Sequence, residues 1–288
     1  MSEELRARVL EIETELKAFA PLMQQRVNAL TADAAKTYAP AFDRISALLA
    51  LSMWLVEKKA FDPAPPAVKV LLARIIESLG ATQVLLKCGF PASGAVAVRS
   101  LFEATANLHL VLANKRQVAV RAKLFENYIK VKRHLRLEKS VAISKKAKSE
   151  NLQNYLAVKA DYHDLGHTWY WKVVKAKKKN AGREANIREL CKYARMLGRY
   201  KKIYPGLSDA SHPSAAFEMW IRDSSGNMIV SPLYTLQINW LEGISVPLAA
   251  EAIQKVLRHV KHPDTRALNF LLAAVCTAGK PSRKAPTS

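Results

Sequence analysis

Acidic residues and cysteines are scarce in this chain of 288 residues. Only 24 Asp and Glu accompany 45 Lys and Arg, which gives a formal net charge of +21 at neutral pH. The three cysteines, Cys88, Cys191 and Cys276, are widely separated and show no paired spacing. We therefore expect no disulfide framework and no zinc site, and the cysteines are typical of reduced thiols in a cytoplasmic protein.

A long apolar run is also absent. The longest stretch, about residues 47–56, is much shorter than the roughly 20 residues that a membrane-spanning helix needs. The amino terminus, MSEELRARVLEIETEL, is acidic and helical and lacks the apolar segment of a secretory signal. We expect a cytoplasmic protein that has no contact with a membrane.

The positive charge is concentrated in the middle third of the chain. Residues 114–205 hold 25 Lys and Arg but only 7 Asp and Glu, and therefore most of the net charge. A local excess of this size favours a polyanionic partner, nucleic acid above all. It gives no information about the fold.

Apolar residues recur at helical spacing along most of the sequence, so we predict an all-α fold. About eight helices are expected in an irregular bundle, and the turn SSGNM allows a short hairpin near 216–233. The prolines of FDPAPPAV separate an N-terminal helical segment, 1–62, from a main helical domain, 63–278. The tail, 279–288, has nothing to bury and is expected to be disordered.

Two local signals concern where helices begin and end. Gly89 followed by Pro91 predicts a junction between two helices, because glycine is favoured just after a helix and proline in the first turn of the next. The polar stretch SKKAKSE, 144–150, is interpreted as a solvated turn that precedes a short helix.

Arg99, Glu103 and Asn107 form a polar stripe on an otherwise apolar helix, expected from about Pro91 to Asn114. A spacing of four residues places all three on one face. Because a buried charge is costly unless it is paired, these residues need partners from other helices. Two interpretations stay open: the Arg99–Glu103 pair fixes helix packing, or it lines a pocket in which Arg99 binds an anion and Glu103 orients it or acts as a base.

A second set of polar residues repeats the spacing of four: Tyr200, Tyr204, Ser208 and His212. On one continuous helix they would share a face, with Asp209 beside them. Pro205 and Gly206 are expected to interrupt that helix. His212 is interpreted either as a structural histidine or as a catalytic one.

The segment YHDLGHTWYW, 162–171, has part of the pattern of a metal site. His163 and His167 have the spacing of two ligands on one helix, with Asp164 close by. The glutamate of an HExxH motif is missing and Gly166 weakens the helix, so no metal is predicted.

Trp169 and Trp171 precede a group of lysines: Lys172, Lys175, Lys177, Lys178 and Lys179. Aromatic faces beside positive charge suit single-stranded nucleic acid, so we predict that these seven residues contact it. In the alternative interpretation, the tryptophans dock on the domain while the lysines stay in water.

These motifs together resemble a bacterial family of helical proteins of unknown function. The resemblance rests on GFPASGAVAVRSLFEATANL, 89–108, and on a distal block that runs from Trp169 or Trp171 through IRELCKYA to YKKIYPGLSDASHPS, 200–214. It covers about residues 65–262. It implies a helical domain in which five residues converge: Arg99, Glu103, Tyr204, Ser208 and His212. It implies no established activity. The signature of the HEPN ribonucleases is an arginine and a histidine with four to six residues between them. No arginine in this chain has a histidine at that spacing, and Arg258 and His262 are one residue too close, so the HEPN ribonucleases do not fit.

The leading hypothesis is therefore a cytoplasmic basic helical protein that contacts nucleic acid, with RNA favoured, through residues 114–202. The first alternative is an enzyme or small-anion sensor built on Arg99, Glu103 and His212. The second is a structural interaction protein. No cofactor is predicted, and the oligomeric state stays open.

Overall fold

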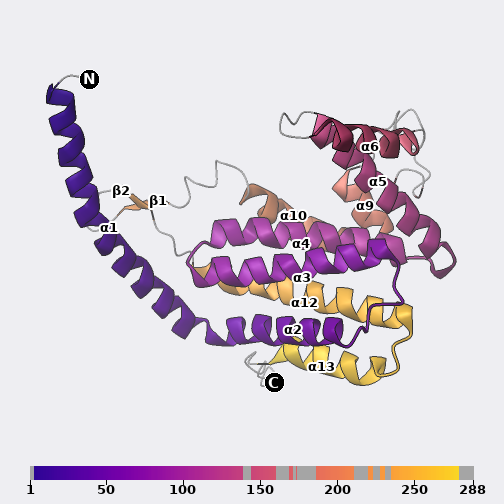
Figure 1. Cartoon of the computed structure of the whole chain (residues 1–288). Helices are drawn as coiled ribbons and strands as arrows, with labels where there is room; N and C mark the ends of the chain where they lie inside the picture. Colours follow the sequence, from indigo (N-terminus) through magenta and orange to yellow (C-terminus); the bar gives the residue numbers. More distant parts are fainter. Residues whose placement is uncertain are drawn as a thin grey trace, which may run out of the picture.

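The computed structural model describes residues 3–138, 144–159, 169–170, 173, 186–210, 220–222, 228–230 and 235–278. Over these residues the chain forms ten α-helices, one 3-10 helix and one pair of short strands (Figure 1). The all-α class is confirmed, although the described helices outnumber the eight or so that the sequence predicts. β1 (Trp220–Arg222) pairs antiparallel with β2 (Met228–Val230), within the segment where a hairpin is expected.

The centre of the fold is a hairpin of two apolar helices, α3 (Pro66–Lys87) and α4 (Pro91–Leu112). α12 (Thr235–Val260) packs against both, and α2 (Ala39–Glu57) and α13 (Thr265–Thr277) pack against α12 (Figure 1). The core consists of large apolar side chains that have no exposed surface, among them Ile45, Leu48, Ile75, Leu101, Phe102, Leu108 and Ile253. Because α2 shares this core, only the first helix of the N-terminal segment stands apart from it.

Gly89 and Pro91 join α3 to α4, as the sequence predicts. Gly89 has a φ of 77°, a conformation that side chains disfavour, and Pro91 occupies the first turn of α4. Between them, the backbone N–H of Phe90 donates to the carbonyl of Leu85 at 2.8 Å. This tight connection returns α4 along α3.

Beyond the end of α4, α5 (Val118–Glu138) and α6 (Lys145–Leu156) form a projection, which we call the α5–α6 knob (Figure 1). The short helix η1 (Lys115–Gln117) connects α4 to α5. Ser144 is the N-cap of α6, and its side chain accepts a hydrogen bond of 3.3 Å from a backbone N–H in the first turn. The expectation of a solvated turn over 144–150 is therefore wrong, because Ser144 starts a helix there.

α9 (Ile187–Tyr193) and α10 (Leu197–Asp209) lie against α4. α10 continues through Pro205 and Gly206, so the expected interruption is wrong. Proline removes one backbone hydrogen bond near the end of this helix, and the helix retains the others. Gly206 permits close packing, because a Cβ at this position would lie 3.3 Å from the ring of Trp240.

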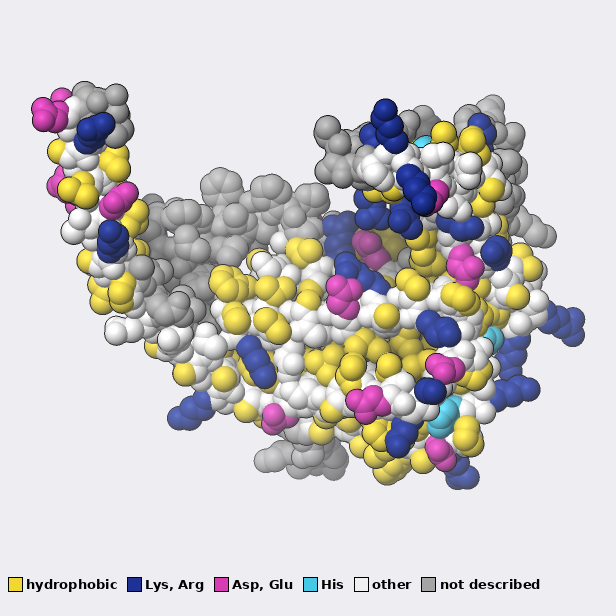
Figure 2. All heavy atoms as spheres, in the orientation of Figure 1, with side chains coloured by type: hydrophobic (Ala, Val, Ile, Leu, Met, Phe, Trp, Pro, Cys, Tyr) yellow, Lys and Arg dark blue, Asp and Glu magenta, His cyan; other side chains and the backbone are white. Residues whose placement is uncertain are grey.

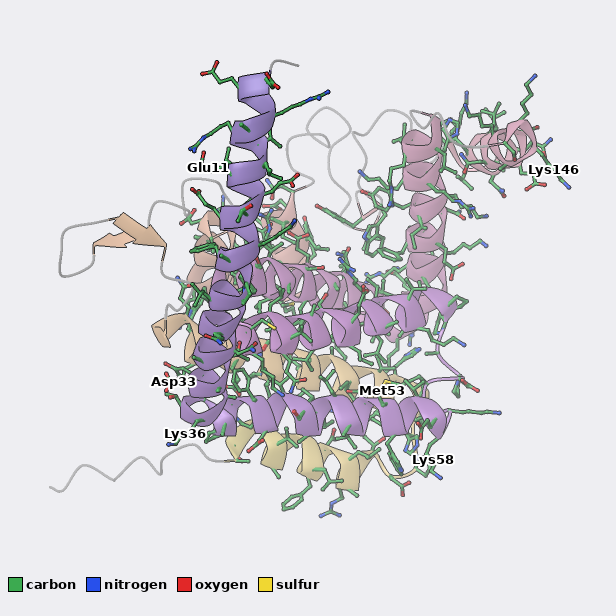
Figure 3. All side chains as sticks on the ribbon, turned by 60° about the vertical axis from the view of Figure 1, so that its left-hand side comes forward. Glu11, Asp33, Lys36, Met53, Lys58 and Lys146 are labelled. Carbon is green, nitrogen blue, oxygen red and sulfur yellow. The ribbon has the colours of Figure 1, made fainter. Side chains whose placement is uncertain are left out.

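α1 (Glu3–Thr37) extends away from the other helices (Figure 1). Asp33 and Lys36 mark the end of α1 that joins the body, as Figure 3 shows. Ala34, 2% exposed, is the first buried residue along the chain among those described. The side chains of residues 3–19 are all exposed.

Two helices, α2 and α4, are long and apolar enough to cross a membrane by length and composition alone. The apolar window is 39% buried in α2 and 67% buried in α4. Core helices of soluble proteins meet the same criterion, so the finding is weak evidence for a membrane span. The absence of a span stays a prediction.

Candidate functional site

The polar stripe of α4 meets α10 in a cluster of three side chains. Arg99 donates through Nε to Glu103 Oε1 at 3.1 Å, and the hydroxyl of Tyr204 donates to the same oxygen at 2.7 Å. The side chains of Arg99 and Glu103 are 32% and 41% exposed. The pair is therefore partly buried, and one side of it faces solvent.

Tyr204 reaches Glu103 because α10 is continuous. Its ring stacks on Tyr200 with centroids 5.0 Å apart and lies 5.7 Å from the ring of Phe102. The guanidinium carbon of Arg99 lies 5.2 Å from the centroid of the Tyr204 ring, which is cation–π geometry. The spacing of four places Arg99 and Glu103 on one face of α4, and both contact Tyr204 of α10.

Asn107 connects this cluster to Trp169. Its amide donates to the backbone carbonyl of Glu103 at 2.7 Å, and its Oδ1 accepts a hydrogen bond of 2.6 Å from the indole of Trp169. Trp169 is only 2% exposed and meets Phe125 edge to face, with centroids 5.4 Å apart. Its ring is therefore docked in the core, as the alternative interpretation predicts, and it presents no face on which a base could stack.

The protonation states of the cluster follow from burial and from Glu103. Burial, together with the hydrogen bond to Glu103, raises the pKa of Tyr204 to about 12, so its phenol is a hydrogen-bond donor at neutral pH. Burial lowers the pKa of Arg99, but the hydrogen bond to Glu103 and the electrostatic interactions with Tyr204 and Glu103 outweigh burial, and that pKa ends above its ordinary value. Burial also raises the pKa of Cys191 to about 12, which makes this thiol a poor nucleophile.

Residues 67–228 match DUF5677, described as a family of unknown function. This match covers more than half of the chain. The chain belongs to this family. No curated protein and no solved structure matches it.

The DUF5677 match contains all described members of the cluster and the whole α5–α6 knob, whereas α1, α2, α12 and α13 lie outside it. It confirms the helical family of unknown function that the motifs resemble. Ser208 is half-buried on α10. His212 lies outside the described residues, so its convergence with Arg99 and Glu103 stays a prediction.

The other predicted nucleic-acid contacts of this DUF5677 protein lie outside the described residues: Trp171, Lys172, Lys175, Lys177, Lys178 and Lys179. The same is true of His163, Asp164 and His167. Over the part of the chain that the structure describes, no group of three or more His, Cys, Asp or Glu could hold a metal ion.

Sequence reasoning missed two clusters of ionisable side chains. Arg44 of α2 and Glu242 of α12 form a buried pair with two contacts, 2.6 and 2.9 Å. His109 of α4, 3% exposed, lies 3.7 Å from Glu251, which also pairs with Arg199 of α10. The only signal for either group was a polar residue within an apolar helical segment.

The α5–α6 knob of the DUF5677 protein carries exposed cations that form no salt bridge among the described residues: Arg133, Arg136, Lys145, Lys146 and Lys148. We call these five the knob cations. Dark blue side chains gather on the knob in Figure 2, and Lys146 extends from its far end in Figure 3. The described acidic side chains of α6 are limited to Glu150.

A small cavity of about 210 Å³ lies between α5 and α6 of the knob. Its lining residues are His134, Leu137, Lys148, Asn151 and Leu152. The ring of His134 stacks on Tyr155 with centroids 4.2 Å apart, and its Nδ1 lies 3.2 Å from the amide nitrogen of Asn151. The lining of the cavity therefore includes an imidazole, an amide and a cation, Lys148.

Proposed function

We propose that this protein binds nucleic acid, RNA in the first place, through the α5–α6 knob. The observation that carries the proposal is the set of knob cations: five exposed Lys and Arg that have no acidic partner among the described residues. Unpaired surface cations contribute little to folding, but they attract a phosphate backbone strongly. The knob also projects from the packed helices (Figure 1).

The cavity of the knob supports contact with a base as well as with phosphate. A base that enters beside His134 would meet the amide of Asn151 at one edge and the ammonium group of Lys148 at another. Stacking on aromatic faces beside a basic groove is how proteins hold single strands without strict sequence preference. Trp169, which is buried, has no part in this proposal.

The lysines of 172–179 extend the proposed surface along the sequence. They belong to the same excess of positive charge within residues 114–205. Counterion release by several lysines makes affinity fall steeply with salt, whatever the sequence of the nucleic acid. The knob cations and the lysines of 172–179 are therefore replaced in two separate variants.

The test is fluorescence anisotropy with a labelled single-stranded RNA, and with DNA of the same sequence, over a range of salt concentrations. Replacement of the five knob cations by Gln is expected to weaken RNA binding and to reduce the slope of log K against log salt by roughly 2–3, at about 0.7 per phosphate contact. Replacement of Lys172, Lys175, Lys177, Lys178 and Lys179 by Gln forms the second arm. Equal affinity for DNA would show that the 2′-hydroxyl is not recognised.

The matched control removes the same charge from other surfaces, by Gln substitution of Lys36, Lys58, Lys69, Arg258 and Arg266. Lys36 and Lys58 lie at the two ends of α2, away from the knob (Figure 3). This variant is expected to keep most of the affinity and of the salt slope. An unchanged slope in the knob-cation variant, or no binding by the unaltered protein at low salt, would contradict the proposal.

A second candidate function, a small-anion sensor or an enzyme, is favoured by the exposed side of the Arg99–Glu103–Tyr204 cluster. Because the Arg99 side chain is 32% exposed, its guanidinium can still donate to a phosphate or carboxylate oxygen, and the Tyr204 phenol can donate to the ligand once it leaves Glu103. Titration of the protein with inorganic phosphate, followed by calorimetry, tests this candidate. Binding that is equal in the Arg99→Met variant would exclude the cluster as the site.

A further inference from the structure

α1 is a long helix whose apolar side chains are exposed. Its 35 residues span about 50 Å, and its main contacts with the body are to α2 and α3. Several large apolar side chains of α1 are exposed by 41–65%: Leu5, Val9, Leu10, Ile12, Leu16, Phe19 and Leu22. They appear as yellow groups along the projecting arm in Figure 2. Exposed apolar surface on this scale marks an interaction site.

The exposed apolar residues follow a heptad pattern. Leu5, Val9, Ile12, Leu16 and Phe19 are separated by four, three, four and three positions. This average spacing of 3.5 is the signature of a helix that packs its stripe against another helix of the same kind. The stripe of a straight single helix would drift around its axis instead.

Pro21 does not disturb this stripe. With Val9 and Leu16 at positions a and Ile12 and Phe19 at positions d, Pro21 occupies position f, which faces away from the seam. The residue costs the helix one backbone hydrogen bond but adds no bulk where a partner helix would pack.

We propose that α1 pairs with α1 of a second copy of this chain in a parallel, in-register coiled coil. In that alignment each of Val9, Ile12, Leu16 and Phe19 meets its own counterpart, so the apolar stripe is buried along its described length. In the same copy the described residues of the body leave this stripe exposed, and α1 extends away from the other helices (Figure 1).

The charges beside the seam fit this alignment. Arg8 at position g lies opposite Glu13 at position e of the other helix, five residues later, and the symmetry makes this attractive pair twice. In the single chain Arg8 pairs with Glu11, and both side chains are 59% exposed, so the exchange of partners costs little.

The antiparallel alternatives fit less well. A register that pairs Val9 with Phe19 and Ile12 with Leu16 buries the whole stripe, but it brings Glu13 to Glu13 and Glu15 to Glu15 of the other helix, and like charges repel. A register that places Val9 opposite Ile12 instead brings Arg8 to Glu15, so its charges are compatible. In that register, however, Phe19 lies opposite the extreme amino terminus and has no apolar counterpart. The parallel dimer is therefore the arrangement to which we commit, and it is independent of the function proposed for the knob.

The test is analytical ultracentrifugation of the full chain at micromolar concentration. We expect a species of twice the 32.0 kDa chain mass. The Ile12→Glu/Leu16→Glu variant is expected to sediment as a monomer, whereas Ala7→Glu/Ala18→Glu, which alters the outer face of the same helix, stays dimeric. Both variants are expected to keep the thermal unfolding of the body, since these residues are exposed.

The register is tested by charge exchange and by cross-linking. Arg8→Glu is expected to weaken the dimer, and Arg8→Glu/Glu13→Arg to restore it. With Cys88 replaced by Ala, an Ile12→Cys variant is expected to form a disulfide-linked dimer under mild oxidation, as two facing d positions allow. A monomeric unaltered protein, a dimer that persists in Ile12→Glu/Leu16→Glu, or no cross-link at position 12 would overturn the proposal.

Discussion

Arg44–Glu242 and Arg99–Glu103 are the same chemical pair in two different surroundings. Arg44 meets Glu242 through two parallel contacts, 2.6 and 2.9 Å, and also donates to the carbonyl of Ala278 at 2.7 Å. Their side chains are only 9% and 5% exposed. Arg99 contacts Glu103 through Nε alone, at 3.1 Å, and both side chains are about a third exposed or more.

The comparison shows that burial and the number of contacts decide how an ion pair affects stability. When one partner of a buried pair is removed, the other is left charged in a medium of low polarity. When one partner of a half-exposed pair is removed, water solvates the other. Arg44–Glu242 is therefore expected to determine stability, and Arg99–Glu103 is available for other roles.

The largest effect is expected for Arg44→Met. The variant leaves Glu242 buried without its cation, which should lower the free energy of unfolding by about 3–5 kcal/mol in urea titrations. Arg44→Met/Glu242→Met should lose much less than the sum of the two single variants, because no uncompensated charge remains. Arg74→Met, which breaks the exposed Arg74–Glu77 pair of α3, is the control and should cost less than about 1 kcal/mol. Equal costs for Arg44→Met and Arg74→Met would refute the comparison.

The second effect concerns His109, which is buried beside Glu251, Lys255 and Arg199. Burial, reinforced by Lys255, lowers the pKa of His109 to about 4 from its ordinary 6.5. The unfolded chain therefore takes up a proton near pH 6.5 that the folded chain takes up only near pH 4, and stability falls as the pH falls through this window. The contribution of His109 reaches up to about 3 kcal/mol at the acidic end.

The measurement is urea unfolding at several pH values between 7 and 4, for the unaltered protein and for His109→Gln. We expect the variant to lose less stability on acidification than the unaltered protein does. His262→Gln, in the loop between α12 and α13, serves as the control and should follow the unaltered protein. Parallel pH profiles for all three proteins would mean that His109 is not the source of the acid sensitivity.

The third effect on stability concerns Trp169. Substitution of this residue shows whether its ring serves the core or stacks on a base. Trp169→Phe removes the donor to Asn107 Oδ1 and part of the buried volume, so it should cost about 1–3 kcal/mol. RNA affinity of the folded variant is expected to stay unchanged. Asn107→Ala, made as a partner variant, should couple to Trp169→Phe in a double-mutant cycle. A stable Trp169→Phe variant that binds RNA more weakly would return the residue to the nucleic-acid surface.

The sequence predicted those parts of the site that depend on spacing within one helix. Arg99, Glu103 and Asn107 share a face because four residues make about one turn, and Tyr200 and Tyr204 do so for the same reason. The all-α class and the Gly89–Pro91 junction could be predicted because they also depend on residues that are close together in the sequence. Pro205 misled the prediction, because proline near the end of a packed helix removes only one hydrogen bond.

Contacts between distant segments could not be predicted in the same way. Arg44 and Glu242 are 198 positions apart, and Asn107 and Trp169 are 62 apart. The local sequence pattern does not indicate that α2 packs against α12, or that Trp169 packs against α4. The cation in AFDRISALLAL and the acid in NWLEGISVPLAA are local signals that each charge needs a partner if it is buried, but they do not identify that partner.

The smallest stability effect is expected for Arg99→Met and Glu103→Gln. Methionine keeps the apolar contact of Arg99 with the Tyr204 ring, and glutamine still accepts the hydrogen bond of the Tyr204 hydroxyl. Because both side chains reach solvent, each variant should change the free energy of unfolding by about 1 kcal/mol or less in urea titrations. A loss as large as that of Arg44→Met would make the cluster a structural one. A small loss, together with abolished phosphate binding, would instead identify a site that was retained for its ligand, because the stability of the fold does not require these charges.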